Sequence, residues 1–167
     1  HLIELGHRRI GLIVGLLDAA VSQERLQGYR RALGDAGIPF DPDLVRYGGL
    51  TEQGGYQKAM ELLEPGNQPT ALFVTSNAMA LGALRAIQAR RVRVPDALSV
   101  ASFGDMPCFS LFRPPLTVVQ QPAYELGLQA AHLLLRRIKG EAPPDHVLMR
   151  LPPILVVGGS TAPPRTV

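Results

Sequence analysis

The sequence has one cysteine, no tryptophan and few aromatic residues, which make up 5% of its 167 residues. A lone cysteine, Cys108, cannot form a disulfide within the chain, which is typical of a reducing compartment and predicts a cytoplasmic protein. No apolar run reaches the ~18 residues of a membrane span. The net charge is only +3, without a block of lysines or arginines, so the chain carries no nucleic-acid-binding patch.

What is present indicates one globular domain with a sizeable core, since 46% of the residues are hydrophobic. Short apolar runs that predict buried strands alternate with segments of helical periodicity. The predicted strands are 10–14, 44–47, 71–75 and 98–103, and the predicted helices are 22–36, 52–63 and 77–90. Ser22, Thr51 and Ser76 are candidate N-caps. This alternation predicts an α/β fold with a mostly parallel sheet flanked by helices, and we expect the proline-rich tail after Ser160 to be loose.

Ligands of such sheets bind beyond the carboxyl ends of the strands. The residues at those ends that we expect to converge on one crevice are Arg25, Leu50, Ser76, Asn77, Gly104 and Asp105. They offer one cation, one carboxylate, a hydroxyl and an amide beside helix N-termini, which suits a small polar ligand, including an anionic one. Two alternatives stay open: Arg25 as a solvated surface charge, and Asp105 as the initiator of a turn.

Motifs for catalysis are lacking. The chain has no G-x-G-x-x-G, no Walker loop and no G-x-S-x-G. No histidine is paired at i, i+4 with another ligand type, and Cys108 has no histidine nearby. We therefore expect no catalytic residue, no metal and no cofactor, and a binding module is favoured over an enzyme.

Six stretches in a fixed order resemble the effector-binding domain of the LacI/GalR family of transcriptional regulators. They are HLIELGHRRIGLIVG, RLQGYRRALGDAGI, PTALFVTSNAMALGALRAI, VPDALSVASFGD, RPPLTVVQQPAYELG and the closing GGST. The resemblance implies a periplasmic-binding-protein-like fold, with a ligand cleft between two similar lobes. It implies a sensor of a small-molecule effector (a sugar, sugar acid or related metabolite) that touches operator DNA only through an N-terminal helix-turn-helix absent from these residues. The alternative is a periplasmic solute-binding protein of a sugar transporter, which shares the fold.

The same resemblance divides the chain. Residues 1–120 correspond to the C-terminal lobe, 121–151 to a remnant of the N-terminal lobe, and 152–167 to the crossing back and the tail. Gln120, Gln121 and Pro122 lie at a lobe crossing, where prolines hold the chain extended. A helix at 123–139 with an apolar stripe and a strand at 147–151 would belong to the first lobe. Because most of that lobe is missing, we expect residues 122–151 to be covered by another copy, displaced or mobile.

The match to the family's pocket is mixed. Arg25, in R-x-x-G, matches the effector-binding arginine. Ser76 and Asn77 stand where the family often has Asn-Asp, Gly104 replaces the first residue of an Asp pair that Asp105 completes, and Leu50 replaces a frequent aromatic residue. The loss of an acceptor carboxylate and of a stacking ring weakens the case for an ordinary sugar.

A homodimer is also predicted. The helix that starts at Asn77 is apolar nearly all round its first turns, so its face away from the sheet needs a second buried contact. The resemblance places the family's dimer interface on this surface, with Leu81, Leu84 and Phe112.

Overall fold

The computed structural model describes residues 1–66, 68–141 and 145–165. Six strands are formed by β1 (Ile10–Val14), β2 (Val45–Tyr47), β3 (Ala71–Val74), β4 (Ser99–Phe103), β5 (Thr117–Gln120) and β6 (Ile154–Val156). Four α-helices are formed by α1 (Ala20–Asp35), α2 (Glu52–Leu62), α3 (Asn77–Ala89) and α4 (Ala123–Ile138). Two short 3-10 helices are η1 (Pro42–Leu44) and η2 (Pro107–Leu111).

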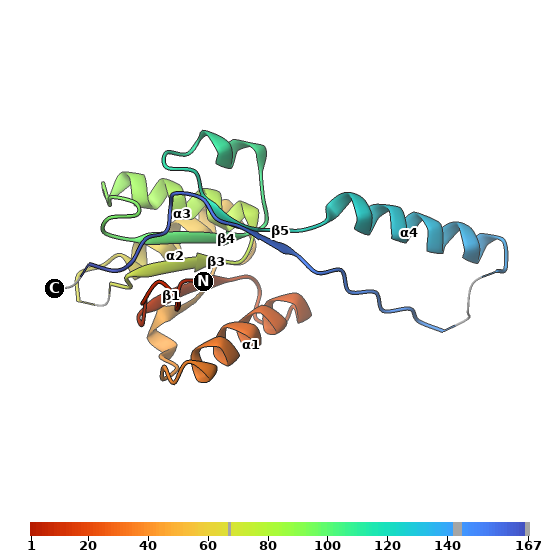
Figure 1. Ribbon diagram of the computed structural model, residues 1–167, viewed down its shortest axis with the longest axis horizontal. Coiled ribbons are helices and arrows are strands. Elements are labelled where there is room, and N and C mark those ends of the chain that lie inside the picture. The colour runs from red at the N-terminus through yellow and green to blue at the C-terminus, as the bar shows by residue number, and fades with distance from the viewer. Residues whose placement is uncertain (67, 142–144, 166–167) are drawn as a thin grey trace.

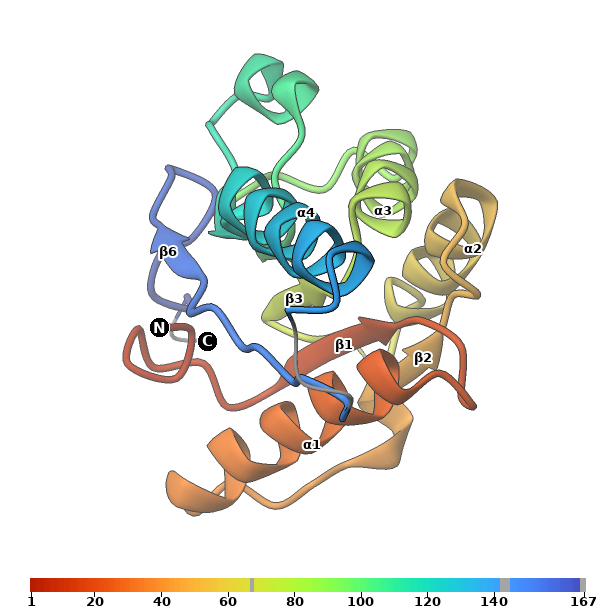
Figure 2. The same ribbon diagram turned by 90° about the vertical axis from the view of Figure 1, so that its right-hand side faces the viewer.

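All six strands join one sheet in the order β2-β1-β3-β4-β5-β6. The first five are parallel, and only β6 runs antiparallel to its neighbour β5. Helices α2 and α3 cover one face of the sheet and α1 lies on the other (Figures 1 and 2). The predicted α/β architecture is therefore confirmed. Within the described residues, no helix is long and apolar enough to cross a membrane.

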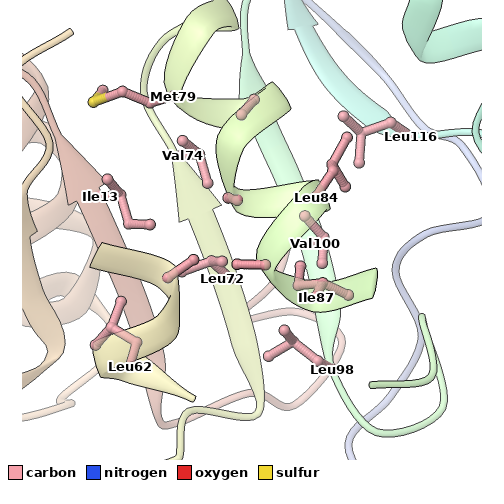
Figure 3. Packing of buried hydrophobic residues seen from close by; sticks show 14 of the residues in the cluster. Ile13, Leu62, Leu72, Val74, Met79, Leu84, Ile87, Leu98, Val100 and Leu116 are labelled. Carbon is pink, nitrogen blue, oxygen red and sulfur yellow. The ribbon is translucent and has the colours of Figure 1, made fainter. Parts of the chain in front are cut away.

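The core consists of two clusters, one on each face of the sheet. The larger one packs Leu72, Val74 and Val100 from the strands against Met79 and Ile87 of α3 (Figure 3). The smaller cluster packs Leu26 and Leu33 of α1 against β1. The apolar residues that predicted the strands thus pack against helices on both faces of the sheet, as expected for a parallel sheet with helices on both sides.

Helices α2 and α3 pack against each other through glycines. A Cβ atom on Gly82 of α3 would lie 2.6 Å from the backbone N of Tyr56, and one on Gly55 of α2 would lie 2.5 Å from the Cα of Met79. Neither glycine can carry a side chain at this backbone separation. Part of the second contact expected for the apolar helix α3 is therefore made by α2 within the same chain, without a second copy.

Two of the three predicted N-caps are confirmed. The Thr51 hydroxyl accepts a hydrogen bond from Gly54 N at 3.0 Å, and Ser76 Oγ accepts one from Met79 N at 3.4 Å. The prediction for Ser22 is wrong, because α1 begins at Ala20 after an Ala19 N-cap that has no side-chain bond. Ser22 is instead buried in the first turn, with its Oγ close to Gly15.

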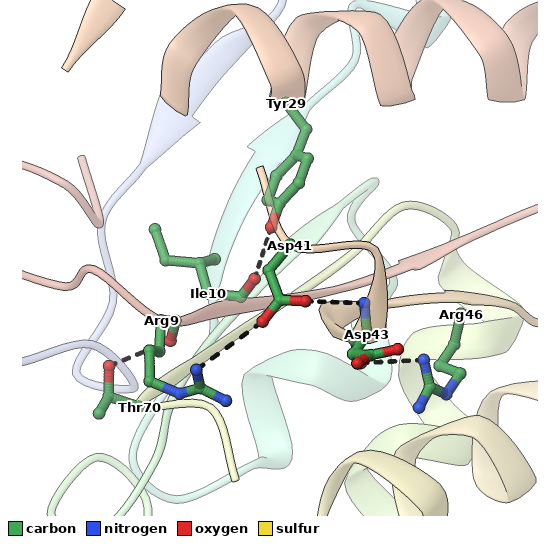
Figure 4. Close-up of polar contacts among 7 residues, drawn as sticks. All are labelled: Arg9, Ile10, Tyr29, Asp41, Asp43, Arg46 and Thr70. Atoms are coloured by element: carbon green, nitrogen blue, oxygen red, sulfur yellow. Dashed lines mark hydrogen bonds and ion pairs between the residues drawn. The ribbon is translucent and has the colours of Figure 1, made fainter. Parts of the chain in front are cut away.

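Polar contacts fasten α1 and η1 to the start of β1 (Figure 4). Tyr29 of α1 donates from its hydroxyl to Ile10 O at 2.7 Å, and Asp41, the N-cap residue of η1, forms an ion pair with Arg9 at 3.8 Å. Burial, followed by the negative charge of Asp41, raises the pKa of Tyr29 to about 12. The phenol therefore stays protonated and keeps its donor role.

The tail after Ser160 is anchored, so the prediction of a loose tail is wrong for the described residues. Ser160 Oγ donates to Val100 O at 2.6 Å and accepts from Thr117 N at 2.8 Å. Ala162 N donates to Ser99 Oγ at 3.0 Å, and Ala162 O contacts Nε2 of the buried His7 at 2.9 Å. These partners lie 43 to 155 residues away along the chain, which is why local composition did not reveal them.

Helix α4 extends away from the domain, and none of its residues is buried (Figure 1). The chain then runs back to β6 without forming the strand predicted at 147–151, so that prediction is wrong. A strand needs a neighbour to pair its backbone groups, and the described residues provide none at this point. What covers the apolar stripe of α4 stays a prediction.

Candidate functional site

The predicted site residues lie at the carboxyl edge of the sheet, because each follows one of the parallel strands β1 to β4. Contacts join them into two groups. Arg25 lies against the ends of β3 and β4, and Asn77 lies against Gly104 and Asp105. The edge also contains the N-termini of α1, α2 and α3.

Arg25 is half-buried in the second turn of α1. Its Nη1 donates a hydrogen bond to Thr75 O, just past the end of β3. Its guanidinium carbon lies 4.1 Å from the ring centroid of Phe103, the last residue of β4. Burial lowers the pKa of the Arg25 guanidinium, but an arginine keeps its charge at any physiological pH. Arg25 is therefore a fixed cation held between two strand ends, and not a freely solvated charge.

The side chain of Asn77 fills the space beside Gly104 where a Cβ atom would otherwise lie. Gly104 has φ +106°, and a Cβ there would lie 2.9 Å from the Cγ of Asn77. The Asn77 amide donates to Asp105 O at 3.5 Å, whereas its Oδ1 is buried and has no hydrogen-bond partner among the residues that the structure describes. Any side chain at position 104 would have to displace Asn77, so the Asn77 amide occupies the space beside Gly104.

Asp105 is exposed and turns towards the lobe crossing. Its Oδ2 accepts a hydrogen bond from Gln120 Nε2 at 3.2 Å. Gln120 is the last residue of β5, and Gln121 and Pro122 connect it to α4. The loop after β4 is thus attached to the segment that leads out of the domain.

The two remaining predicted site residues contribute less polar chemistry. Ser76 uses its hydroxyl to cap α3. Leu50 has a left-handed φ of 61° and is 38% exposed. Its Cδ2 lies over Gly15 at the end of β1, 2.5 Å from where a Cβ would be. Leu50 therefore forms an apolar wall of the edge.

A hollow among the described residues borders this edge without containing most of the predicted site residues. It has a volume of about 680 Å³ and lies along the α1 face of the sheet. Arg25 and Phe103 line one part of it, and the rest is mostly apolar, including Phe73, Ala101 and Leu33. Leu50, Ser76, Asn77, Gly104 and Asp105 do not line it. The polar chemistry is at the carboxyl edge, so we take the edge as the candidate site and the hollow as an uncovered part of the sheet.

Three contributors to the edge were not among the predicted effector-binding residues. Phe103 supplies the ring beneath Arg25, Thr75 supplies the acceptor carbonyl, and Gln120, predicted only as a crossing residue, binds Asp105. Because Phe103 ends a predicted strand, the sequence could have placed it at the carboxyl edge. Its contact with Arg25 could not be predicted, since it depends on which face of the sheet α1 covers.

The predicted dimer residues lie on or near α3. Leu81 and Phe112 are half-buried, and Leu84 is only 7% exposed because it packs in the larger core cluster. Leu111, next to Phe112, is 76% exposed. Leu81, Leu111 and Phe112 therefore offer more apolar surface to a partner than Leu84 does, and the interface itself stays a prediction.

Residues 1–161 match the family described as periplasmic binding protein-like domain. The chain belongs to this family. Its relatives include the ribose operon repressor of Haemophilus influenzae, 41% identical over 138 residues, which are 83% of this chain and 42% of that protein. They also include the transcriptional repressor CytR of Escherichia coli, 39% identical over 84% of this chain and 41% of that protein. The chain thus spans less than half the length of these curated relatives.

Solved structures agree. A LacI family transcriptional regulator from Mycobacterium smegmatis superimposes with a TM-score of 0.90 and 34% identity, over 99% of this chain and 61% of the other. A complex of the regulator CelR with cellobiose gives a TM-score of 0.88 and 41% identity, over 95% of this chain and 48% of the other. The predicted resemblance to LacI-type regulators is confirmed, and the solute-binding alternative is not favoured.

Proposed function

We propose that this chain is the effector-sensing part of a LacI-type transcription regulator, and that a small polar molecule binds at the carboxyl edge of its sheet. The observation that carries the proposal is the position of Arg25, a half-buried cation at the ends of β3 and β4 in a chain whose relatives are repressors. Arg25, Asn77 and Asp105 bind the effector through polar contacts, and Leu50, Ser76 and Gly104 shape its surroundings. The chain catalyses no reaction.

The proposal includes a division of labour within the regulator. Residues 1–120 form one lobe of the effector-binding domain, residues 121–151 belong to the other lobe, and residues 152–167 return to the first. Gln120, Gln121 and Pro122 form the crossing. The regulator works as a homodimer through the α3 surface with Leu81, Leu84 and Phe112, a proposal supported by dimeric Lac repressor structures of 35% identity. Operator DNA is contacted by a part of the regulator outside these residues.

A thermal-shift screen of the full-length regulator against sugars, sugar acids, nucleosides and purines tests the proposal. At least one compound should raise the melting temperature, because a ligand that binds only the native state stabilises it. Arg25→Ala should weaken the binding of that compound at least tenfold, since a charged hydrogen bond contributes about 1.5–3 kcal/mol. Unchanged affinity in Arg25→Ala would place the effector elsewhere. In a gel-shift assay, the 167-residue chain alone should bind no DNA sequence specifically.

A further inference from the structure

A bidentate ion pair joins the N-terminal part of α1 to the segment that returns from α4 to β6. Arg150 donates two hydrogen bonds to the Glu24 carboxylate, from Nη1 to Oε2 at 3.2 Å and from Nη2 to Oε1 at 3.0 Å. A guanidinium fork on a carboxylate adds geometric specificity to the attraction of the charges, because two donors and two acceptors are aligned at once. The two residues are 126 positions apart, so the pair is a tertiary contact that no local pattern requires.

Arg150 belongs to an exposed, irregular segment. Residues 145–150 are all exposed and form neither helix nor strand. Helix α4, which precedes this segment, buries none of its residues. Pairing with the sheet resumes at β6, where Ile154 lies opposite Gln120. The contact with Glu24 therefore fixes the course of a stretch of chain that is held neither by the core nor by the sheet.

Glu24 makes this contact although another arginine follows it directly in the sequence. Successive residues of an α-helix point about 100° apart, so Glu24 and Arg25 do not face one another. Arg25 turns towards the strand ends, where it contacts the Thr75 carbonyl and the Phe103 ring. The hydrogen bonds and the charge of Arg150 lower the pKa of the Glu24 carboxyl. Two neighbouring positions of α1 thus serve different partners, one at the candidate site and one on the returning segment.

The position of the pair connects it to the candidate site. Glu24, Arg25 and the crossing residue Gln121 line the same hollow. In the division of the chain proposed above, Glu24 lies in the first lobe and Arg150 at the end of the other, so the pair spans the two lobes beside Arg25. We propose, building on the function proposed above, that Glu24 and Arg150 are positioning residues whose ion pair holds the two lobes in the arrangement that binds the effector.

Such a pair acts by shifting a population, without touching the effector. When fewer molecules are in the arrangement that binds, the apparent dissociation constant rises in proportion. Exposed ion pairs are weak because water and salt screen them, so the pair should change the affinity about two- to fivefold and should not decide whether the effector binds. Its distinctive mark is that the affinity for an uncharged effector depends on the salt concentration.

Calorimetry of the full-length regulator with three uncharged probes, D-ribose, cellobiose and adenosine, tests the inference at about 50 mM and about 500 mM sodium chloride. For a probe that binds, Glu24→Gln and Arg150→Gln should each weaken binding about two- to fivefold at low salt. High salt should weaken binding to the wild type by a similar factor and leave the two variants nearly unchanged. Arg150→Lys keeps the charge but loses the fork, so its affinity should lie between those of the wild type and Arg150→Gln.

The double variant Glu24→Gln/Arg150→Gln should bind no more weakly than either single variant, because all three lose the same contact. The matched control is Asp96→Asn, which removes a similarly exposed ion pair with Arg165, at 3.7 Å, between two parts of one proposed lobe. It should leave the affinity and its salt dependence unchanged. Probe binding that is unaffected by Glu24→Gln and Arg150→Gln would overturn the positioning role while leaving the proposed function standing. Binding of no probe at all would count against the proposed function itself.

Discussion

Asp105 and Gln120 are joined by a hydrogen bond of 3.2 Å that connects the loop after β4 to the last residue of β5. One partner belongs to the proposed effector site and the other to the proposed lobe crossing. Both side chains are exposed, so the bond can break and form without exposing core. The pair therefore joins the proposed effector site to the segment that leads to α4.

The first prediction concerns this pair. Because the bond is exposed, Gln120→Ala and Asp105→Ala should each change the free energy of unfolding by less than about 1 kcal/mol. Their effects on effector affinity should not be additive: a double-mutant cycle should give a coupling of at least about 0.5 kcal/mol. Calorimetry on the four proteins measures it. Additive losses would mean that the bond carries no coupling between site and crossing.

The second prediction concerns the buried His7, which ties the N-terminal segment to the tail. Its Nε2 donates to Ala162 O at 2.9 Å, and its Nδ1 lies 2.9 Å from Thr70 Oγ1. Burial, partly offset by the bond to Ala162, lowers the pKa of His7 below its usual 6.5. Near and below pH 6.5, His7 therefore binds a proton more readily in the unfolded chain than in the native state. The free energy of unfolding should fall as the solution is acidified.

Urea unfolding at about pH 7.5 and about pH 5.5 measures this loss, because stability depends on the difference in bound protons between the two states. His7→Gln keeps a side-chain donor and cannot titrate, so the loss between the two pH values should be smaller in this variant. His132→Gln, at an exposed site on α4, is the matched control and should behave as the wild type. The same loss in wild type and His7→Gln would show that other groups cause it.

The third prediction compares two helical glycines, one closely packed against a neighbouring helix and one with open space around it. A Cβ on Gly82 would clash with the backbone of α2, whereas one on Gly34 of α1 would meet nothing within 4 Å. Gly82→Ala should therefore lower the free energy of unfolding by about 1–3 kcal/mol through overpacking. Gly34→Ala should raise it by about 0.4–1 kcal/mol, because alanine restricts the unfolded chain. Chemical denaturation distinguishes the two, and equal effects would contradict the close packing of α2 and α3.

The parts of the fold that sequence predicted well are those with local causes. The apolar run at β1 and the caps Thr51 and Ser76 act on their immediate neighbours, and the structure has all three where expected. Ser22 has the right residue type for a cap, but α1 starts earlier and packs it near Gly15. The anchoring of the tail depends on Thr117 and His7, which no local pattern connects to it.

The same distinction between local and long-range causes applies to the candidate site. A parallel sheet brings its carboxyl ends to one edge whatever the side chains are, so the position of Arg25 near that edge was predictable. Its contact with Phe103 was not, because it requires knowing that α1 covers this face of β4. The neutral Asn77–Gly104 pair was also hidden, since Gly104 alone does not show what fills the space it leaves.

The last prediction concerns α4. Its apolar stripe is open, with Leu126 40%, Leu134 60% and Ile138 73% exposed. Burying each such side chain contributes roughly 1.5–3 kcal/mol, and large exposed apolar patches mark interaction surfaces. The 167-residue chain on its own should therefore self-associate at micromolar concentrations, as measured by analytical ultracentrifugation.

Replacing Leu134 and Ile138 together by lysine should shift the isolated chain towards the monomer, because two charges on the stripe oppose its burial. His132→Lys adds a charge on another face of the same helix and should leave the association unchanged. If the double variant associates as strongly as the wild type, the contact lies elsewhere, and the surface of Leu81 and Phe112 becomes the candidate. A wild-type chain that stays monomeric throughout this range would show that the exposed stripe does not drive association, even though four turns of an amphipathic helix are left without a partner in the described part of the chain.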